Sequence, residues 1–182
     1  ADMSRLDIKI CGLSTADTIK AALNGGASHV GFIHFAKSPR HLTPDTLAEL
    51  SPLLPPSVKK VGVTVDPDDM TIDALVRSGG LQVLQLHGKE PPERVAQLRQ
   101  RTGLEVWKVI SVKTAADLAA GAAYVGAADM LLYDAKTPEG AALPGGMGQR
   151  FDWTLLANHR APLPWGLSGG LDAGNVAEAI RM

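Results

Sequence analysis

The stretch VLQLHGKEPPERVAQLRQRTGLEVWKVI, residues 83–110, has the pattern of one complete strand–helix–strand unit. Its two apolar runs, Val83–Leu86 and Val106–Ile110, do not alternate strictly with polar residues, as expected of parallel strands covered on both faces. Between them, two prolines precede the helical stretch Glu93–Arg101, and Gly103 follows where a helix would stop. The segment therefore predicts two parallel strands joined by a helical crossover.

The same pattern recurs along the chain. The seven apolar runs predicted as strands are Asp7–Cys11, His29–Ile33, Lys60–Val65, Val83–Leu86, Val106–Ile110, Met130–Tyr133 and Pro164–Leu167. Capping residues also precede the helical stretches Ala16–Leu23 and Asp45–Leu50. Repeated right-handed crossovers of this kind build either an open doubly wound sheet or a closed barrel, and periodicity alone does not choose between them.

Length and composition narrow the class of protein. The chain has 182 residues, of which 45% are hydrophobic, and this predicts a single domain over residues 1–182. With 18 basic and 19 acidic residues it has no charge pattern for nucleic acid or a membrane surface, so the expected partner is a small molecule. The lone Cys11 favours a reducing, cytoplasmic location. Composition leaves monomer and homodimer open.

Two reactive side chains stand where predicted strands end. Cys11 closes the first strand, and Asp134 follows the sixth. In a βα barrel, catalytic residues gather at the C-terminal ends of the strands. A thiolate there can act as a base, and a carboxylic acid can donate the proton that opens a sugar ring. The alternative for Cys11 is an inert buried thiol. For Asp134 it is a helix cap or a surface partner of Lys136.

Three further segments are candidates for binding a ligand. Arg40 could hold a planar carboxylate through two hydrogen bonds, although most loop arginines are simply solvated. The turn Ser168–Gly170 exposes backbone amides that suit a phosphate, or it is only a tight turn. Gln85 and His87 end the fourth strand, where they could contact a substrate, although a structural histidine is commoner. No second ligand stands at metal-binding spacing beside His87.

The longest irregular stretch, Ala135–Arg150, is rich in proline and glycine. Loops of this length in compact domains are usually functional or disordered. Composition alone does not decide between a functional loop and a surface excursion.

Taken in order, six motifs resemble the phosphoribosylanthranilate isomerase family from end to end of the chain. They are K-I-C-G at Lys9–Gly12, S-P-R at Ser38–Arg40, Q-L-H-G at Gln85–Gly88, L-L-x-D at Leu131–Asp134, G-G-x-G with F-D-W at Gly145–Trp153, and S-G-G-L with N-V at Ser168–Val176. Any one of them could arise by chance, but six in this order and spacing hardly could.

The resemblance implies an α/β fold, a (βα)8 TIM barrel, with no metal and no organic cofactor. It implies an isomerase of tryptophan biosynthesis that converts N-(5-phosphoribosyl)anthranilate to 1-(o-carboxyphenylamino)-1-deoxyribulose 5-phosphate by an Amadori rearrangement. Asp134 would be the acid and Cys11 the base. Arg40 would pair with the anthranilate carboxylate, and the amides of Gly169 and Gly170 would hold the phosphate.

The family pattern continues past the position of Met182 with an eighth βα unit, whose D-x-S-S-G-V-E motif completes the phosphate site. We therefore expect the chain to end before that unit, inside its seventh helix, and to lack roughly 20–30 residues. Two other functions stay open. One is an inactive or partly active barrel fragment that binds phosphorylated ligands. The other is a histidine-pathway aminoaldose isomerase. A resemblance to that family would imply a site with two carboxylates, and Cys11 at the end of the first strand argues against it.

Overall fold

The computed structural model describes residues 6–135 and 150–181. Its strands are β1 (Lys9–Cys11), β2 (His29–His34), β3 (Lys59–Thr64), β4 (Val83–Leu86), β5 (Glu105–Val112), β6 (Met130–Ala135) and β7 (Trp165–Leu167). Its α-helices are α1 (Ala16–Asn24), α2 (Pro44–Leu50), α3 (Asp69–Gly79), α4 (Pro92–Thr102), α5 (Ala115–Leu118) and α6 (Val176–Arg181). The 3-10 helices are η2 (Ser51–Leu53), η3 (Ala119–Tyr124) and η4 (Trp153–Leu156). The strands follow one another in the sheet in chain order, as in an α/β protein.

The predicted strands are confirmed, with differences at their ends. β4 has the predicted bounds, whereas β5 and β6 both continue past their apolar runs. The reason is pairing, because Ser111 lies opposite Asp134 and Val112 opposite Ala135 in the parallel ladder. Asp134 is therefore a strand residue and not the first residue of the loop. Between β6 and β7 the described residues hold the 3-10 helix η4.

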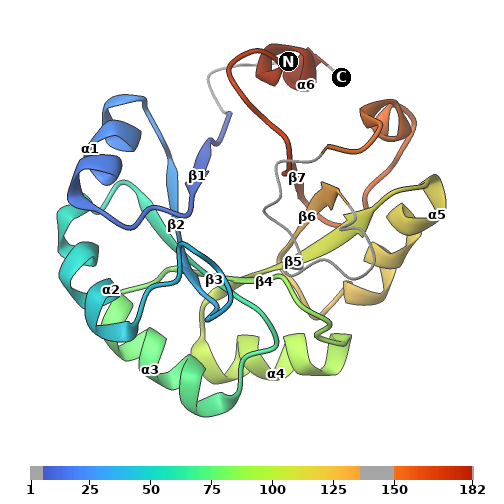
Figure 1. Cartoon of the computed structure of the whole chain (residues 1–182). Coiled ribbons are helices and arrows are strands. Elements are labelled where there is room, and N and C mark those ends of the chain that lie inside the picture. Colours follow the sequence, from blue (N-terminus) through green and yellow to red (C-terminus); the bar gives the residue numbers. More distant parts are fainter. Residues whose placement is uncertain (1–5, 136–149, 182) are drawn as a thin grey trace. The chain divides into compact units, whose positions relative to one another are not determined.

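The first compact unit comprises Ala1–Gln85 with Thr102–Glu105. Within it, β2 pairs in parallel with both β1 and β3. Helices α1, α2 and α3 lie along one side of these strands (Figure 1). Ile19, Leu47 and Leu75 of the three helices are buried in one cluster with Val30 and Phe32 of β2. This core fixes β2, and with it the two neighbouring strands, against the helices.

The helices of this unit begin at side-chain caps, which satisfy backbone N–H groups that have no partner inside the helix. The caps are Thr15, which accepts from the N–H of Thr18, Thr43, which accepts from that of Thr46, and Asp68, which accepts from that of Thr71. Among the helices of residues 6–135 and 150–181, none is long and apolar enough to cross a membrane.

The second compact unit comprises Leu86–Arg101 with Val106–Met182. Within it, β6 pairs in parallel with β5 and β7. Trp153 of η4 and Tyr133 of β6 are both almost fully buried in its apolar cluster. The Tyr133 hydroxyl lies 2.7 Å from Nε2 of His159, and burial raises the Tyr133 pKa. This hydrogen bond connects β6 to the segment that precedes β7, in which His159 lies.

Two residues of α3 provide a test of the packing of the first unit. Ile72 is fully buried, whereas Met70 on the same helix is 81% exposed. We expect Ile72→Ala to lower the free energy of unfolding by about 2–5 kcal/mol, because it leaves a cavity in place of a fully buried side chain. Met70→Ala should change it by less than about 0.5 kcal/mol. Urea unfolding followed by far-UV circular dichroism measures both, and equal effects would contradict the packing described.

Candidate functional site

Cys11 stands at the C-terminal end of β1 and is half-buried, with a free thiol. Its register partner on β2 is Gly31. A Cβ atom at Gly31 would lie 2.9 Å from Cys11 Sγ and 3.2 Å from Cys11 Cα, so a larger residue would push the thiol or its backbone aside. The missing side chain at Gly31 is therefore what makes room for the thiol beside β2.

Arg40 reaches from the β2–α2 loop to the turn after Cys11. Its Nη1 lies 3.5 Å from the carbonyl oxygen of Cys11. A Cβ atom at Gly12 would lie 2.3 Å from that nitrogen, so the guanidinium group rests against the bare backbone of Gly12. Gly12 also has φ +77°, a conformation that side chains disfavour. Two predicted site residues that are distant in sequence are thus neighbours.

Two histidines brace the loop that carries Arg40. Nδ1 of His34 lies 2.7 Å from the carbonyl oxygen of Leu42, and His41 forms an isolated bridge with Ile33. The two imidazole centroids are 4.6 Å apart. Burial lowers the pKa of His41, and the neighbouring His34 lowers it further. A neutral His41 lets the rings pack together without charge repulsion, which helps to fix the loop.

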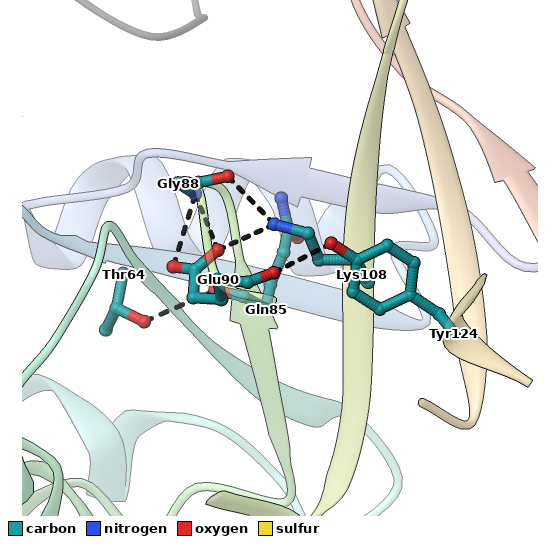
Figure 2. Close-up of polar contacts among 6 residues, drawn as sticks. All are labelled: Thr64, Gln85, Gly88, Glu90, Lys108 and Tyr124. Atoms are coloured by element: carbon teal, nitrogen blue, oxygen red, sulfur yellow. Dashed lines mark hydrogen bonds and ion pairs between the residues drawn. The ribbon is translucent and has the colours of Figure 1, made fainter. Parts of the chain in front are cut away.

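Lys9 is a site residue that the sequence analysis missed. It lies two residues before Cys11 on β1, so the two side chains project from the same face of the strand. Its Nζ donates a 2.5 Å hydrogen bond to Oε1 of Gln85, at the end of the first unit. Gln85 is buried, and its carbonyl oxygen lies 3.5 Å from the Thr64 hydroxyl (Figure 2). The period-two spacing of Lys9 and Cys11 could have indicated that the two side chains share a face of the strand, but not that Lys9 meets Gln85.

In the second unit, His87 and Asp134 come together. Nε2 of His87 lies 3.1 Å from Oδ2 of Asp134, although the two do not have hydrogen-bond geometry. The other carboxylate oxygen, Oδ1, accepts from the N–H of Ala135 at 2.9 Å. Asp134 is 4% exposed. A buried carboxyl with an imidazole beside it can exchange a proton with a ligand or with its neighbour, which is the requirement for acid catalysis.

The turn Ser168–Gly170 has the backbone shape of a small cradle. Gly169 and Gly170 both have positive φ angles, +89° and +67°. The side-chain amide of Asn175 donates to the carbonyl oxygen of Gly170 at 2.8 Å, and the N–H of Ser168 donates to the carbonyl oxygen of Tyr133 at 2.8 Å. These bonds hold the turn at the end of β7, and successive amides in such a turn suit an anion.

The structure thus assembles the predicted residues within each unit. Cys11, Arg40 and Gln85 belong to the first unit, and His87, Asp134 and the Ser168–Gly170 turn belong to the second. The predicted loop at 135–150 lies, apart from its two end residues, outside the described residues. The G-G-x-G motif at 145–148 lies outside them as well.

Comparisons with known proteins agree on one family. A sequence model described as N-(5'-phosphoribosyl)anthranilate isomerase matches residues 8–182. A curated relative of that name from Rhodospirillum centenum is 51% identical over 177 residues, which are 97% of this chain and 83% of the relative. The relative of the same name from Brucella canis is 53% identical over 175 residues, covering 96% of this chain and 79% of the relative.

Solved structures give the same result. A crystal structure of phosphoribosyl anthranilate isomerase from Thermotoga maritima superposes with a TM-score of 0.84 at 33% identity, covering 97% of this chain and 82% of that one. A second, with a TM-score of 0.82 and 30% identity, covers 97% of this chain and 81% of that one. That protein was crystallised with reduced 1-(o-carboxyphenylamino)-1-deoxyribulose 5-phosphate.

The contact between Arg40 and Gly12 can be tested with a matched pair of variants. Gly12 and Gly26 both have positive φ, but a Cβ atom at Gly26 would meet nothing within 4 Å. Each change to alanine should cost about 1–2 kcal/mol of unfolding free energy through backbone strain. Only Gly12→Ala should also displace the Arg40 guanidinium from the Cys11 carbonyl oxygen. Crystal structures of the two variants measure this displacement. An unmoved Arg40 would contradict the close approach described.

Proposed function

The chain belongs to the N-(5'-phosphoribosyl)anthranilate isomerase family, and from that membership we propose that it catalyses the Amadori rearrangement of N-(5-phosphoribosyl)anthranilate to 1-(o-carboxyphenylamino)-1-deoxyribulose 5-phosphate in tryptophan biosynthesis. The observation that carries the proposal is the match of the family model to residues 8–182. The reaction is an aldose–ketose isomerisation, which needs one acid and one base but no redox reagent.

Asp134 acts as the acid in this mechanism. In its protonated form it gives a proton to the ring oxygen of the ribose, the ring C–O bond breaks, and the anilino nitrogen supplies the electron pair that forms an iminium ion. Support comes from its burial and from His87, whose Nε2 lies 3.1 Å from Oδ2 and which, when protonated, offsets the negative charge left on the carboxylate. The backbone bond from Ala135 keeps one oxygen occupied, so that Oδ2 is the oxygen that exchanges the proton.

Cys11 acts as the base. The iminium ion acidifies the proton on C2 of the sugar, and the thiolate removes it to leave an enolamine, which tautomerises to the aminoketose. The half-buried position at the end of β1 supports this role, because a reactive thiol must reach its substrate. The gap at Gly31 leaves room for the sulfur.

The remaining residues bind the two ends of the substrate. Arg40 pairs with the anthranilate carboxylate, for which a planar guanidinium has matching geometry. The amides of Gly169 and Gly170, next to Ser168, hold the 5-phosphate. Gln85 and His87 are further substrate-binding residues in this proposal. Binding at sites remote from C2 orients the reacting carbon against the base.

We also propose the finer architecture that the family implies. The seven βα units belong to a (βα)8 barrel that forms a single domain. The chain spans 79–83% of the length of the first curated relatives, and the eighth unit is our assignment for the part of those relatives that it does not match. The enzyme is cytoplasmic, as its single cysteine favours. For quaternary structure we propose a monomer or a homodimer, since the Thermotoga maritima relative is a dimeric enzyme from which monomers were generated and crystallised.

The alternative functions receive less support. The relatives and solved structures reported above are named phosphoribosylanthranilate isomerases, so a histidine-pathway aminoaldose isomerase is not favoured. An inactive phosphate-binding fragment would keep the turn at 168–170 but would need neither Cys11 nor Asp134.

A turnover assay tests the function and both catalytic roles. Freshly generated phosphoribosylanthranilate is added and its fluorescence is followed. Wild type should convert it, while Cys11→Ser and Asp134→Asn should lower kcat by about 10²–10⁴-fold. Asp45→Asn removes an exposed carboxylate in the first turn of α2 and should leave kcat unchanged. Far-UV circular dichroism checks that each variant folds.

The relative from Rhodospirillum centenum, run beside it, shows that the assay works. No turnover by folded wild type in an assay where this relative is active would refute the proposed function. Undiminished kcat in either active-site variant would refute that residue's role.

A further inference from the structure

A buried ion pair lies next to the strand end that carries His87. Nζ of Lys108, on β5, is 2.7 Å from Oε1 of Glu90, which lies just before α4. The two side chains are 4% and 1% exposed. Taking two charges out of water costs several kcal/mol each, and a pair of apolar residues of similar size often gives an equal or more stable protein. General stability therefore does not explain this pair.

The pair holds the backbone of one residue, Gly88, through both its N–H and its carbonyl group. The carboxylate of Glu90 accepts from the N–H of Gly88, with distances of 2.9 and 3.2 Å to its two oxygens. Lys108 donates to the carbonyl oxygen of the same residue at 2.8 Å. Figure 2 shows both groups converging on Gly88. Gly88 directly follows His87, so the backbone beside the imidazole is fixed by two charge-assisted bonds.

Tyr124 extends this arrangement. Its hydroxyl donates to the carbonyl oxygen of Glu90 at 2.7 Å (Figure 2). Its ring centroid is 5.7 Å from Nζ of Lys108, within range of a cation–π contact. Glu90 is therefore anchored through both its side chain and its backbone, by β5 and by η3. The anchor leaves the segment from His87 to Glu90 little freedom to shift.

Strand register places Lys108 and Asp134 on opposite faces of the sheet. Lys108 lies opposite Leu131 on β6, and Ser111 lies opposite Asp134. Because side chains alternate along a strand, Lys108 and Leu131 project from one face of the sheet and Asp134 from the other. Leu131 belongs to the buried cluster that packs against Trp153. The ion pair therefore lies on the opposite face of the sheet from the acid.

We propose that Glu90 and Lys108 are positioning residues, which clamp the backbone of Gly88 and thereby hold the imidazole of His87 against the carboxylate of Asp134. The proposal rests on the proposed function in one respect, namely that Asp134 is the acid. Loss of the clamp lets the backbone at Gly88 shift, the imidazole leaves the carboxylate, and proton donation slows. Most of the substrate affinity comes from Arg40 and the turn Ser168–Gly170, which the clamp does not touch, so affinity changes little.

The first test does not depend on activity. The double variant Glu90→Leu/Lys108→Met removes both charges of the pair together, so neither is left buried without the other. The probe is the ¹⁵N signals of the His87 ring, assigned with His87→Ala. In the wild-type background, Asp134→Asn should move these signals. In the double-variant background, the same change should move them by less than half as much. An equal response in both backgrounds, or no response in wild type, would overturn the proposal.

The second test measures turnover. The double variant should lower kcat at least tenfold while KM stays within about threefold, and it should have no further effect on kcat once His87 is alanine. Effects that simply multiply would show that the pair does not act through His87 and would overturn the proposal. The matched control is Arg99→Met, which breaks the more exposed Arg99–Asp129 pair of the same unit. It should leave kcat unchanged.

Two outcomes need separate readings. If the double variant does not fold, Glu90→Gln replaces it, because a neutral amide removes the negative charge that strengthens the bonds to Gly88 and Lys108. The same ring signals then decide the proposal. If folded wild type shows no turnover, the proposed function fails. The response of the His87 ring to Asp134→Asn, compared between the wild-type and double-variant backgrounds, still decides whether the clamp positions the imidazole.

Discussion

Parallel pairing of consecutive strands is the constraint on which the rest of this structure depends. β1, β2 and β3 pair in parallel in the first unit, and β5, β6 and β7 do so in the second. A parallel pair cannot be joined by a tight turn, so a crossover must return the chain to the start of the next strand. The crossover segment covers the strands it joins, which is why the strands are apolar on both faces. It also brings successive strand ends to the same edge within each unit.

This geometry explains which residues carry chemistry. Cys11, Gln85 and Asp134 all stand at the last or next-to-last position of a strand, where side chains leave the packed sheet. Close approach there needs small residues. Gly31 makes room for the thiol and Gly12 for the guanidinium of Arg40, and in both cases the missing Cβ allows the contact. The glycines thus determine the site as much as the reactive groups do.

In the second unit the two faces of the sheet carry different ionisable groups. One face carries Asp134, and the other carries Lys108 in contact with Glu90. A charge on the covered face is costly unless every hydrogen-bonding group finds a partner. The clamped backbone of Gly88 provides such partners for both members of the pair, its N–H for Glu90 and its carbonyl oxygen for Lys108. The arrangement links the covered face of the sheet to the strand end beside the acid.

The sequence by itself determined the elements and the reactive groups. Apolar runs, capping threonines and the prolines before α4 act over a few residues, so the strand β4 and the helix starts could be predicted from local patterns. The order of six motifs indicated the family and selected Cys11, Arg40, His87 and Asp134. Only the tertiary structure decided which side chains meet. The contacts of Lys9 with Gln85 and of Lys108 with Glu90 join residues 76 and 18 positions apart, and they depend on packing between segments that no local pattern contains.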